Sequence, residues 1–322
     1  MTASFDAAIH RFAPPLPVAI ALSGGADSTA LLIACVRKWP GQVHAVHVNH
    51  GLQAAAATFE AHCVALCERL VVPLVVERVD AHAQAGQSPE DAARIARYGA
   101  LDSFVAGQAV GGRSLSVALA QHADDQVETL LLALGRGAGL AGLSAMPSHW
   151  LRHGVNFFRP LLAVPGQEIR HWLTEQREPF VEDPSNSDET FLRNRIRARL
   201  MPALRDVFPH YAQTLTRSTA HAAQAQSLLT EIAATDWRSV CDESGNSPQI
   251  KLLQTLSPAR LANVLRHWLA QYCQSQASSA QLKELMEQIA ACTTRGHQLN
   301  IKVGHGFVQR NKGSLAWYNS AV

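Results

Sequence analysis

The chain has 322 residues and a net charge of only +2. Hydrophobic residues make up 47% of the sequence, a fraction that favours packed cores and excludes a disordered chain. The length is enough for two domains, and the weak charge neither requires nor excludes a nucleic-acid partner.

The cysteines and the hydrophobic runs indicate a compartment. The 6 cysteines are scattered and none belongs to a Cys-x-x-Cys pair, which favours buried free thiols over a metal site. The first residues do not form a signal peptide, and no apolar run reaches the ~18 residues that span a bilayer. We therefore expect a cytoplasmic protein with no membrane partner.

Strand and helix signals alternate over the first two hundred residues of the chain. Strands are expected at 18–22, 43–48, 74–79 and 115–120, with helices at 28–38, 55–70 and 89–106 between them. This alternation predicts an α/β fold, with a parallel sheet and helices on both of its faces. Ligands of such sheets bind outside the carboxyl ends of the strands.

The sequence changes character after a polar loop near residues 180–188. Helical patterns follow at 210–235, 257–273 and 278–291. Alternating residues over 297–318, with glycines at the turns, predict a short β-hairpin. We therefore expect one domain at residues 1–209, and a linker helix with a smaller, mainly helical accessory domain at residues 210–322.

A glycine-containing loop follows the first expected strand. It consists of Ser23, Gly24, Gly25, Ala26, Asp27 and Ser28. A plain tight turn is the alternative interpretation of such a motif on its own. However, glycines let the backbone approach a ligand closely, and the free N–H groups of the helix that follows favour phosphate. Asp27 is a candidate ligand for a Mg²⁺ that bridges phosphates. No Gly-Lys-Ser/Thr follows, so this is not a Walker A loop.

A second polar segment follows the strand expected at 115–120 and opens another helix. It contains His122, Asp124, Asp125 and Glu128. Because the carboxyl ends of parallel strands lie at one edge of a sheet, this segment and the glycine loop should face the same crevice. Acidic residues at a helix start also serve as caps and favour the helix dipole. Several of them beside a histidine, opposite a phosphate loop, favour a Mg²⁺ site.

Four motifs occur in a fixed order. They are Ser-Gly-Gly-x-Asp-Ser from residue 23, His-Val-Asn-His-Gly-Leu from residue 47, His-x-Asp-Asp-Gln-x-Glu-Thr from residue 122, and Glu-Asp-Pro-Ser-Asn from residue 182 with Arg-Asn-x-Ile-Arg from residue 193. The first resembles the loop of N-type ATP pyrophosphatases (the PP-loop family), whose fold is that of the adenine nucleotide alpha hydrolases. Together, the motifs resemble the bacterial tRNA(Ile)-lysidine synthetase family over about residues 16–205.

This resemblance implies a two-step reaction at the wobble cytidine of tRNA(Ile) with the anticodon CAU. ATP adenylates the C2 carbonyl oxygen and releases pyrophosphate. The ε-amine of free L-lysine then attacks C2 and displaces AMP, which gives lysidine. ATP and Mg²⁺ are the implied cofactors, and tRNA(Ile) and L-lysine are the implied partners.

The resemblance also implies roles in phosphate chemistry. Residues 23–28 would bind the phosphates of ATP. Mg²⁺ would be held by Asp27 and Asp125, with Asp124 as a further candidate ligand. His122 would contact the region of the α-phosphate.

Further roles concern charge and the lysine amine. Arg97 and Arg197 would stabilise phosphate charge or hold the tRNA. Lysine must attack as a neutral amine although its ordinary pKa is ~10.4, so a carboxylate base would help, and Glu128 or Asp124 could serve.

A stripe of five arginines within thirteen residues, with no acid among them, suggests an RNA surface: Arg193, Arg195, Arg197, Arg199 and Arg205. On a helix, 193 and 197 would share one face, and 195 and 199 another. The candidates for RNA binding are Arg94, Arg136, Arg193, Arg195 and Arg199, and the candidates for stacking on bases are Tyr98, Phe157 and Phe158. A solvated helix face is the alternative for the arginines. Many family members carry a further C-terminal domain, and we expect this chain to carry a single accessory domain.

Two other functions remain open on the sequence. One is another adenylating tRNA-modifying enzyme of the PP-loop family, such as a thiolase without an iron–sulfur cluster, since the clustered cysteines of the iron–sulfur type are absent. The other is an ATP- and tRNA-binding module without turnover. The paired acidic residues favour an enzyme, because ATP binding alone does not require them.

Overall fold

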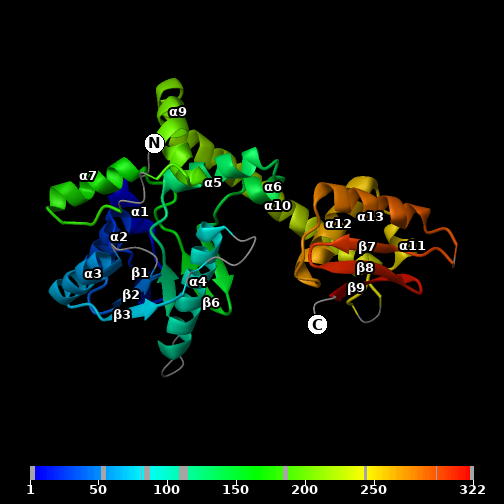
Figure 1. Cartoon of the computed structure of the whole chain (residues 1–322), viewed down its shortest axis with the longest axis horizontal. Coiled ribbons are helices and arrows are strands. Elements are labelled where there is room, and N and C mark those ends of the chain that lie inside the picture. Colours follow the sequence, from blue (N-terminus) through cyan, green and yellow to red (C-terminus); the bar gives the residue numbers. More distant parts are fainter. Residues whose placement is uncertain are drawn as a thin grey trace. The chain divides into compact units, whose positions relative to one another are not determined.

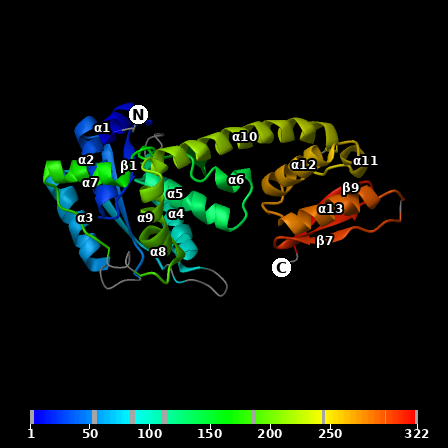
Figure 2. The ribbon, with the colours of Figure 1, turned by 90° about the horizontal axis from the view of Figure 1, so that it is seen from above.

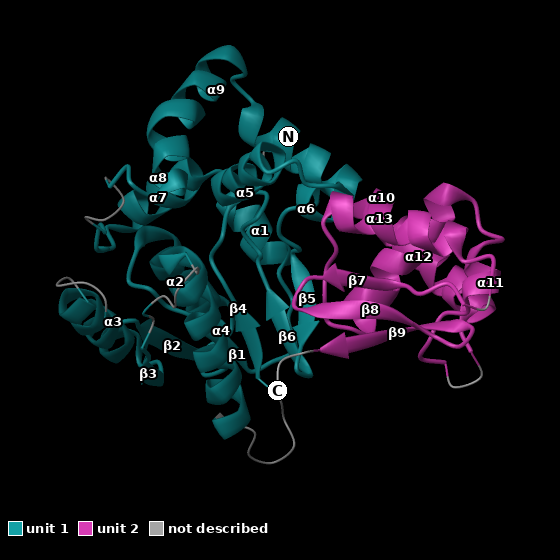
Figure 3. Ribbon diagram, turned by 45° about the vertical axis from the view of Figure 1, so that its right-hand side comes forward, with its two compact units in different colours: residues 1–222 teal, residues 223–322 magenta. Residues whose placement is uncertain are grey.

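The computed structural model describes residues 4–51, 56–80, 82, 88–108, 115–183, 188–242, 245–294 and 296–319. These residues form two compact units, divided between residues 222 and 223 (Figure 3). Each unit has its own hydrophobic core. The division lies within one long helix, α10 (Tyr211–Val240), which begins just after the boundary that the sequence suggests.

The first unit is built on a six-stranded sheet in the order β3-β2-β1-β4-β6-β5 (Figure 1). Its parallel strands are β1 (Val18–Ala21), β2 (Val43–Asn49), β3 (Leu74–Arg78), β4 (Ser116–Ala118) and β6 (Val155–Phe158). The remaining strand, β5 (His149–Arg152), is antiparallel. The predicted parallel α/β sheet is confirmed, and the four expected strands lie where the sequence places them.

Helices cover both faces of this sheet because the strand residues alternate between two apolar clusters. Val18 and Ile20 of β1 pack with α1 (Phe5–Arg11), α2 (Ala26–Lys38), α3 (Ala56–Leu70) and α7 (Gly166–Gln176). Ala19 packs in the other cluster, with α4 (Pro89–Gln108). Figure 2 shows the two layers from above.

The strand order reverses between β1 and β4. The chain leaves β1 toward β2 and β3 on one side, then returns through α4 to β4 on the other side. The carboxyl ends of β1 and β4 therefore flank the crevice in which open α/β sheets bind their ligands. The glycine loop follows β1, and the polar segment that begins at His122 follows β4.

A helical layer completes the first unit beside that crevice. It comprises α5 (Ala123–Gly135), α6 (Leu140–Leu143), α8 (Leu192–Arg195), the π-helical turn η2 (Ile196–Leu200), α9 (Met201–Val207) and the start of α10. Ala123 and Val127 of α5 are fully buried in its core, against Ile196 and Tyr211. This packing fixes α5 between the sheet and the start of α10.

The second unit is mainly helical and ends in a small antiparallel sheet. Its further elements are α11 (Ile250–Leu253), α12 (Pro258–Gln271), α13 (Ser279–Ala291), β7 (Asn300–Val303), β8 (Gly306–Asn311) and β9 (Ser314–Asn319). Its core gathers Trp237, Leu265 and Trp268. The tail expected as a hairpin has three strands in the order β7-β8-β9, because a second turn precedes β9.

No helix among the described residues is long and apolar enough to cross a membrane.

Candidate active site

The glycine loop is held in shape by its own serines. The Ser28 hydroxyl accepts a hydrogen bond from the Ser23 backbone N–H at 3.1 Å and donates one to the Gly25 carbonyl at 3.2 Å. No side chain caps α2, whose N-cap is Gly25. The N–H groups of the first helical turn are therefore left for an anionic ligand, which the helix dipole also favours.

Gly24 occupies a position that only glycine fits. Its φ of +88° lies in the left-handed region, and a Cβ atom there would come within 3.2 Å of the Cys63 sulfur and of the Phe59 ring. The loop thus rests directly on α3. Behind it, the Leu22 carbonyl is 2.8 Å from Nδ1 of the buried His47.

The segment after β4 forms a capping box at the start of α5. His122 is the N-cap, and its Nδ1 accepts a hydrogen bond from the Asp124 N–H at 3.2 Å. The Asp125 carboxylate accepts the His122 N–H at 3.0 Å in return. These bonds fix the His122 ring relative to the helix.

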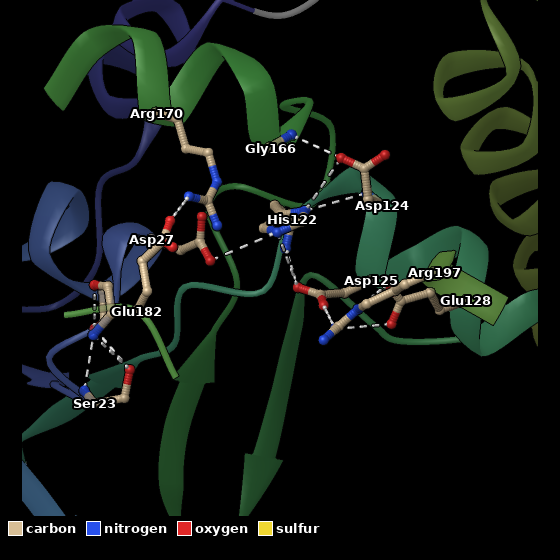
Figure 4. Close-up of polar contacts among 12 residues, drawn as sticks. Ser23, Asp27, His122, Asp124, Asp125, Glu128, Gly166, Arg170, Glu182 and Arg197 are labelled. Carbon is tan, nitrogen blue, oxygen red and sulfur yellow. Dashed lines mark hydrogen bonds and ion pairs between the residues drawn. The ribbon is translucent and has the colours of Figure 1, made fainter. Parts of the chain in front are cut away.

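The two motifs meet at His122, as Figure 4 shows. Its Nε2 lies 3.6 Å from a carboxylate oxygen of Asp27 and 3.6 Å from one of Asp125. Asp27 belongs to the first turn of α2 and Asp125 to that of α5, so two helix N-termini deliver carboxylates to one imidazole. The two motifs, expected to face each other, therefore meet at the carboxyl ends of β1 and β4.

Burial and the neighbouring charges shift the pKa values of the side chains in this cluster. Burial raises the pKa of Asp27, and the Asp125 carboxylate raises it further against the opposing effect of His122. Burial lowers the pKa of His122, but the surrounding carboxylates, chiefly Asp125 and Asp27, outweigh burial and hold that pKa above its ordinary value. Carboxylates crowded in this way favour a cation between them.

The donor set fits a magnesium ion bound together with phosphates. Mg²⁺ is usually held by one or two carboxylates and completes its octahedron with water and substrate phosphate. Asp27 and Asp125 supply such a pair. No group of three or more His, Cys, Asp or Glu side chains in the described part of the chain is arranged to hold a metal, so a cage made of protein ligands alone is not seen there.

Asp124 faces away from that pair. One of its oxygens accepts the Tyr211 hydroxyl at 2.6 Å, and the other accepts the backbone N–H of Gly166 at 2.8 Å. Both oxygens are therefore engaged by protein donors, which argues against the metal and base roles that the sequence offers for Asp124.

Glu128 is enclosed by Arg197. The guanidinium Nε is 2.5 Å from one oxygen of Glu128 and its NH2 is 2.9 Å from the other, while NH2 also lies 3.2 Å from Asp125. The Glu128 side chain is 2% exposed, and burial raises its pKa while Arg197 opposes the rise. This bidentate pair argues against Glu128 as the base for lysine, and the contact with Asp125 places Arg197 beside the carboxylates that face His122.

Arg97 of α4 is half-buried. Burial lowers its pKa and the nearby Arg193 adds to this effect, while Tyr98 and Glu90 oppose it. Arg97 also contributes, after burial, to lowering the pKa of His50 to about 4. Within the described residues no carboxylate binds its guanidinium. It therefore remains a candidate for binding an anion.

The arginines expected to bind RNA differ in exposure. Arg195 and Arg136 are exposed, as are Arg94, which pairs with Asp91, and Arg199, which pairs with Glu189. Arg193 is half-buried: it pairs with Glu90 at 2.9 Å and its NH2 is 3.3 Å from the Thr129 hydroxyl. Arg193 therefore joins α4 to α5.

Among the stacking candidates, Phe157 is fully buried in the sheet core, which excludes it from stacking on a base. Tyr98 packs edge-on against Trp150, and its hydroxyl accepts a hydrogen bond from Arg159. Phe158 stacks on His149 at a centroid distance of 4.6 Å.

Pro184, Ser185 and Asn186, part of the motif that begins at Glu182, lie outside the described residues.

Three residues of the site have no clear sequence signal. Arg170 of α7 lowers the pKa of Asp27 and pairs with Glu182 at 3.1 Å (Figure 4). Gly166 begins the same helix, and Tyr211 begins α10. Only the Pro165-Gly166 step, a typical helix start, could have drawn attention to this segment.

An open groove of about 980 Å³ lies at the carboxyl ends of β2 and β3, against α3. Asn49, His50, Glu60 and Arg78 contribute to its lining. The Asn49 amide donates to Glu60 at 2.8 Å. The motif that begins at His47 thus borders a hollow on the strand next to the one that carries the glycine loop.

All cysteines of the chain are free thiols. Cys63 and Cys67 lie on α3, where burial raises their pKa values to about 12 and about 11, so neither is a ready thiolate. This agrees with the expectation of buried thiols and gives no support to an iron–sulfur centre.

Comparisons with known proteins cover nearly the whole chain. Residues 2–204 match a family model described as a PP-loop domain, and residues 249–316 match one described as a TilS substrate binding domain. Among solved structures, the U34-tRNA thiolase NcsA from Methanococcus maripaludis with its [4Fe-4S] cluster is similar, with a TM-score of 0.52 and 16% identity over 63% of this chain and 70% of that chain. At this identity the likeness shows the fold alone.

Curated relatives share one name. A tRNA(Ile)-lysidine synthase from Polaromonas naphthalenivorans is 55% identical over 308 residues, which cover 95% of this chain and 91% of the relative. One from Escherichia coli O157:H7 is 38% identical over 310 residues, covering 95% of this chain and 70% of the relative. With these matches along both units, the chain belongs to the tRNA(Ile)-lysidine synthase family.

Proposed function

We propose that this chain joins L-lysine to C2 of the wobble cytidine of tRNA(Ile) with a CAU anticodon. Family membership supports the reaction class, a ligase that forms a carbon–nitrogen bond at the expense of ATP. The observation that carries the assignment is the meeting of Asp27 and Asp125 at His122, beside the uncapped start of α2. Phosphates on that helix would lie next to paired carboxylates.

The first step is adenylation of the C2 carbonyl oxygen. Residues 23–28 would hold the pyrophosphate portion of ATP through backbone N–H groups and serine hydroxyls. His122 would donate from Nε2 toward the α-phosphate, since its Nδ1 accepts from the backbone. The groove bordered by Asn49 and His50 suits the nucleoside portion.

Asp27 and Asp125 would hold Mg²⁺. When bound, the ion would neutralise the phosphate charge that develops as the carbonyl oxygen attacks. Arg197 lies beside Asp125 and would orient that carboxylate while adding positive charge. Arg97 is a half-buried cation, which suits an anion subsite.

The second step is attack by the ε-amine of lysine on C2, with AMP leaving. The amine must lose a proton first. Asp124 and Glu128 both have their oxygens engaged, so we assign the base to neither. A binding site for lysine beside the acidic start of α5 would suit its ammonium group.

The tRNA would be held by both units. Arg195 and Arg199 present exposed charge on the segment that carries Arg197. Their phosphate contacts would make binding salt-dependent. The second unit, which matches the substrate-binding model, would bind a further part of the tRNA, and residues 1–209 would form the catalytic domain.

The buried free thiols suit a cytoplasmic location.

The decisive experiment is mass analysis of a CAU-anticodon tRNA(Ile) transcript after incubation with the chain, ATP, Mg²⁺ and L-lysine. Lysine should be incorporated, with AMP and pyrophosphate released in equal amounts. ATP binding without AMP production would favour a binding module, and sulfur transfer to the tRNA would favour a thiolase. Either result would overturn the proposal.

A further inference from the structure

Asp124 lies at the centre of a chain of hydrogen bonds that the reaction steps above do not use. Its carboxylate accepts the Tyr211 hydroxyl at 2.6 Å and the Gly166 N–H at 2.8 Å. Its own backbone N–H donates to Nδ1 of His122 at 3.2 Å. Tyr211 is 4% exposed, so its hydroxyl donates to Asp124 in a place shielded from water. Figure 4 shows the Gly166, Asp124 and His122 part of the arrangement.

This chain of hydrogen bonds determines which nitrogen of His122 faces the reaction. Nδ1 must be unprotonated in order to accept the Asp124 N–H, so the neutral ring carries its proton on Nε2. Nε2 is the atom that faces Asp27 and Asp125. A shift of the Asp124 backbone would therefore release the ring and free the other tautomer.

Gly166 lies against His122 and Asp124 at the start of α7. A Cβ atom at this position would lie 3.0 Å from Cε1 of His122 and 3.1 Å from the Asp124 carboxylate. A side chain here would press on both groups, so glycine favours the close approach at which the Gly166 N–H donates to Asp124. The ring of His122 is confined between α7 and the start of α5.

We infer that Tyr211 is a positioning residue of the catalytic centre, acting through Asp124 on His122. The inference rests on the function proposed above. Tyr211 is the first residue of α10, and the same helix continues to Val240 in the second unit. Arg205 holds the phenol in place, with its NH2 3.4 Å from the hydroxyl and its guanidinium over the ring. The helix shared by the two units thus begins on the catalytic motif.

A spectroscopic test reads the His122 ring without any turnover. The full chain labelled with ¹⁵N-histidine is compared as wild type and as Tyr211→Phe, and the His122 signals are identified by their loss in His122→Gln. At a pH high enough to keep the His122 ring neutral, wild type should show the Nε2–H tautomer, and Tyr211→Phe should show a mixture of tautomers. An identical His122 spectrum in both proteins would overturn the inference.

A kinetic test separates positioning from binding. Tyr211→Phe should lower kcat for lysidine formation about tenfold, the effect of losing one hydrogen bond to a charged group, with the KM for lysine and the Kd for tRNA changed less than twofold. Tyr318→Phe, at an exposed tyrosine of β9, is the matched control and should leave kcat unchanged. Retention of wild-type kcat by Tyr211→Phe would contradict the inference.

An epistasis test checks that the effect passes through Asp124. In an Asp124→Asn background, adding Tyr211→Phe should change kcat less than twofold. A further tenfold loss would show that Tyr211 acts by another route. Should Tyr211→Phe fail to fold, as judged by its melting curve, the tautomer mixture is sought in Asp124→Asn, and its absence there also overturns the inference. Failure of wild type to modify tRNA would overturn the proposed function alone, because the spectra need no activity.

Discussion

At the scale of single residues, the site depends on carboxylates that the fold holds near one another in spite of their repulsion. Asp27 and Asp125 both lie 3.6 Å from the same nitrogen of His122. Burial and this like charge raise the pKa of Asp27. Such an arrangement is costly to the folded chain without a cation, and it is typical of functional sites.

Asp27→Asn should separate stability from activity. The substitution removes a buried charge that faces a like charge, so the melting temperature should stay the same or rise. AMP formation should fall at least a hundredfold, because the proposed magnesium pair loses one member. Release of AMP in the presence of tRNA and lysine is measured beside a thermal melt. Asp206→Asn, at an exposed carboxylate of α9, is the control. Near-normal activity of Asp27→Asn would remove the metal role proposed for this residue.

His50 should make the fold sensitive to acid. Burial first, and then the nearby Arg97, lower its folded pKa to about 4 from the ordinary value of 6.5. The unfolded chain therefore binds more protons than the folded chain between these two pH values. The contribution of neutral His50 to stability is complete above pH 6.5 and is lost as the pH falls toward 4. Urea midpoints measured across this range should fall less steeply for His50→Gln than for wild type. The exposed His221 provides a control, and equal slopes for wild type and His50→Gln would show that His50 is not buried near a positive charge.

At the scale of elements, periodicity and motif order predict the parallel sheet, the helices between its strands and the crevice where the glycine loop meets the His122 segment. They do not predict the β5–β6 hairpin or the π-helical turn η2. The hairpin turns at His153 and Gly154, both with positive φ, and this short signal is easily missed beside longer patterns. A single π-turn leaves no periodic signal at all.

The expected arginine stripe keeps its two faces: Arg193 and Arg197 both contact side chains of α5, while Arg195 and Arg199 are exposed. A regular helix places Arg193 and Arg197 on one face. Arg197 binds Glu128 and Asp125, while Arg193 binds Glu90 and Thr129. The side-chain partners that separate these roles come from α4 and α5, distant in sequence. Sequence patterns therefore identify the arginines without resolving which of them serve the site.

The glycine loop allows a matched pair of substitutions. Gly24→Ala should destabilise the fold by about 1–2 kcal/mol or more, because the left-handed φ disfavours a Cβ and the new atom would press on Cys63 and Phe59. Gly25→Ala should change stability by less than about 0.5 kcal/mol, since its φ is ordinary and its nearest new contact would be 3.6 Å away. Urea denaturation of the two variants measures the difference. Equal losses for both would contradict the proposed support of the loop by α3.

At the scale of the whole molecule, two cores share one helix. The core of the first unit gathers around the sheet, and that of the second includes Trp237 and Trp268. Asp236, at 1% exposed, lies on the part of α10 that belongs to the second unit and binds Arg260 of α12, with Arg260 Nε 3.0 Å from its carboxylate. This ion pair fastens α10 to the second core without touching the catalytic motifs.

Asp236→Ala should therefore affect one unit and ATP the other. Loss of the charge-assisted hydrogen bonds should cost the second unit about 1–3 kcal/mol, since the half-exposed Arg260 returns to water at little further cost. Scanning calorimetry should show one transition lowered by several degrees in Asp236→Ala, while ATP with Mg²⁺ raises the other transition. Glu231→Ala, at an exposed carboxylate of the same helix, should leave both unchanged. A single transition shifted by both the substitution and the nucleotide would show that the two cores unfold as one, and that α10 couples their stabilities rather than only joining them.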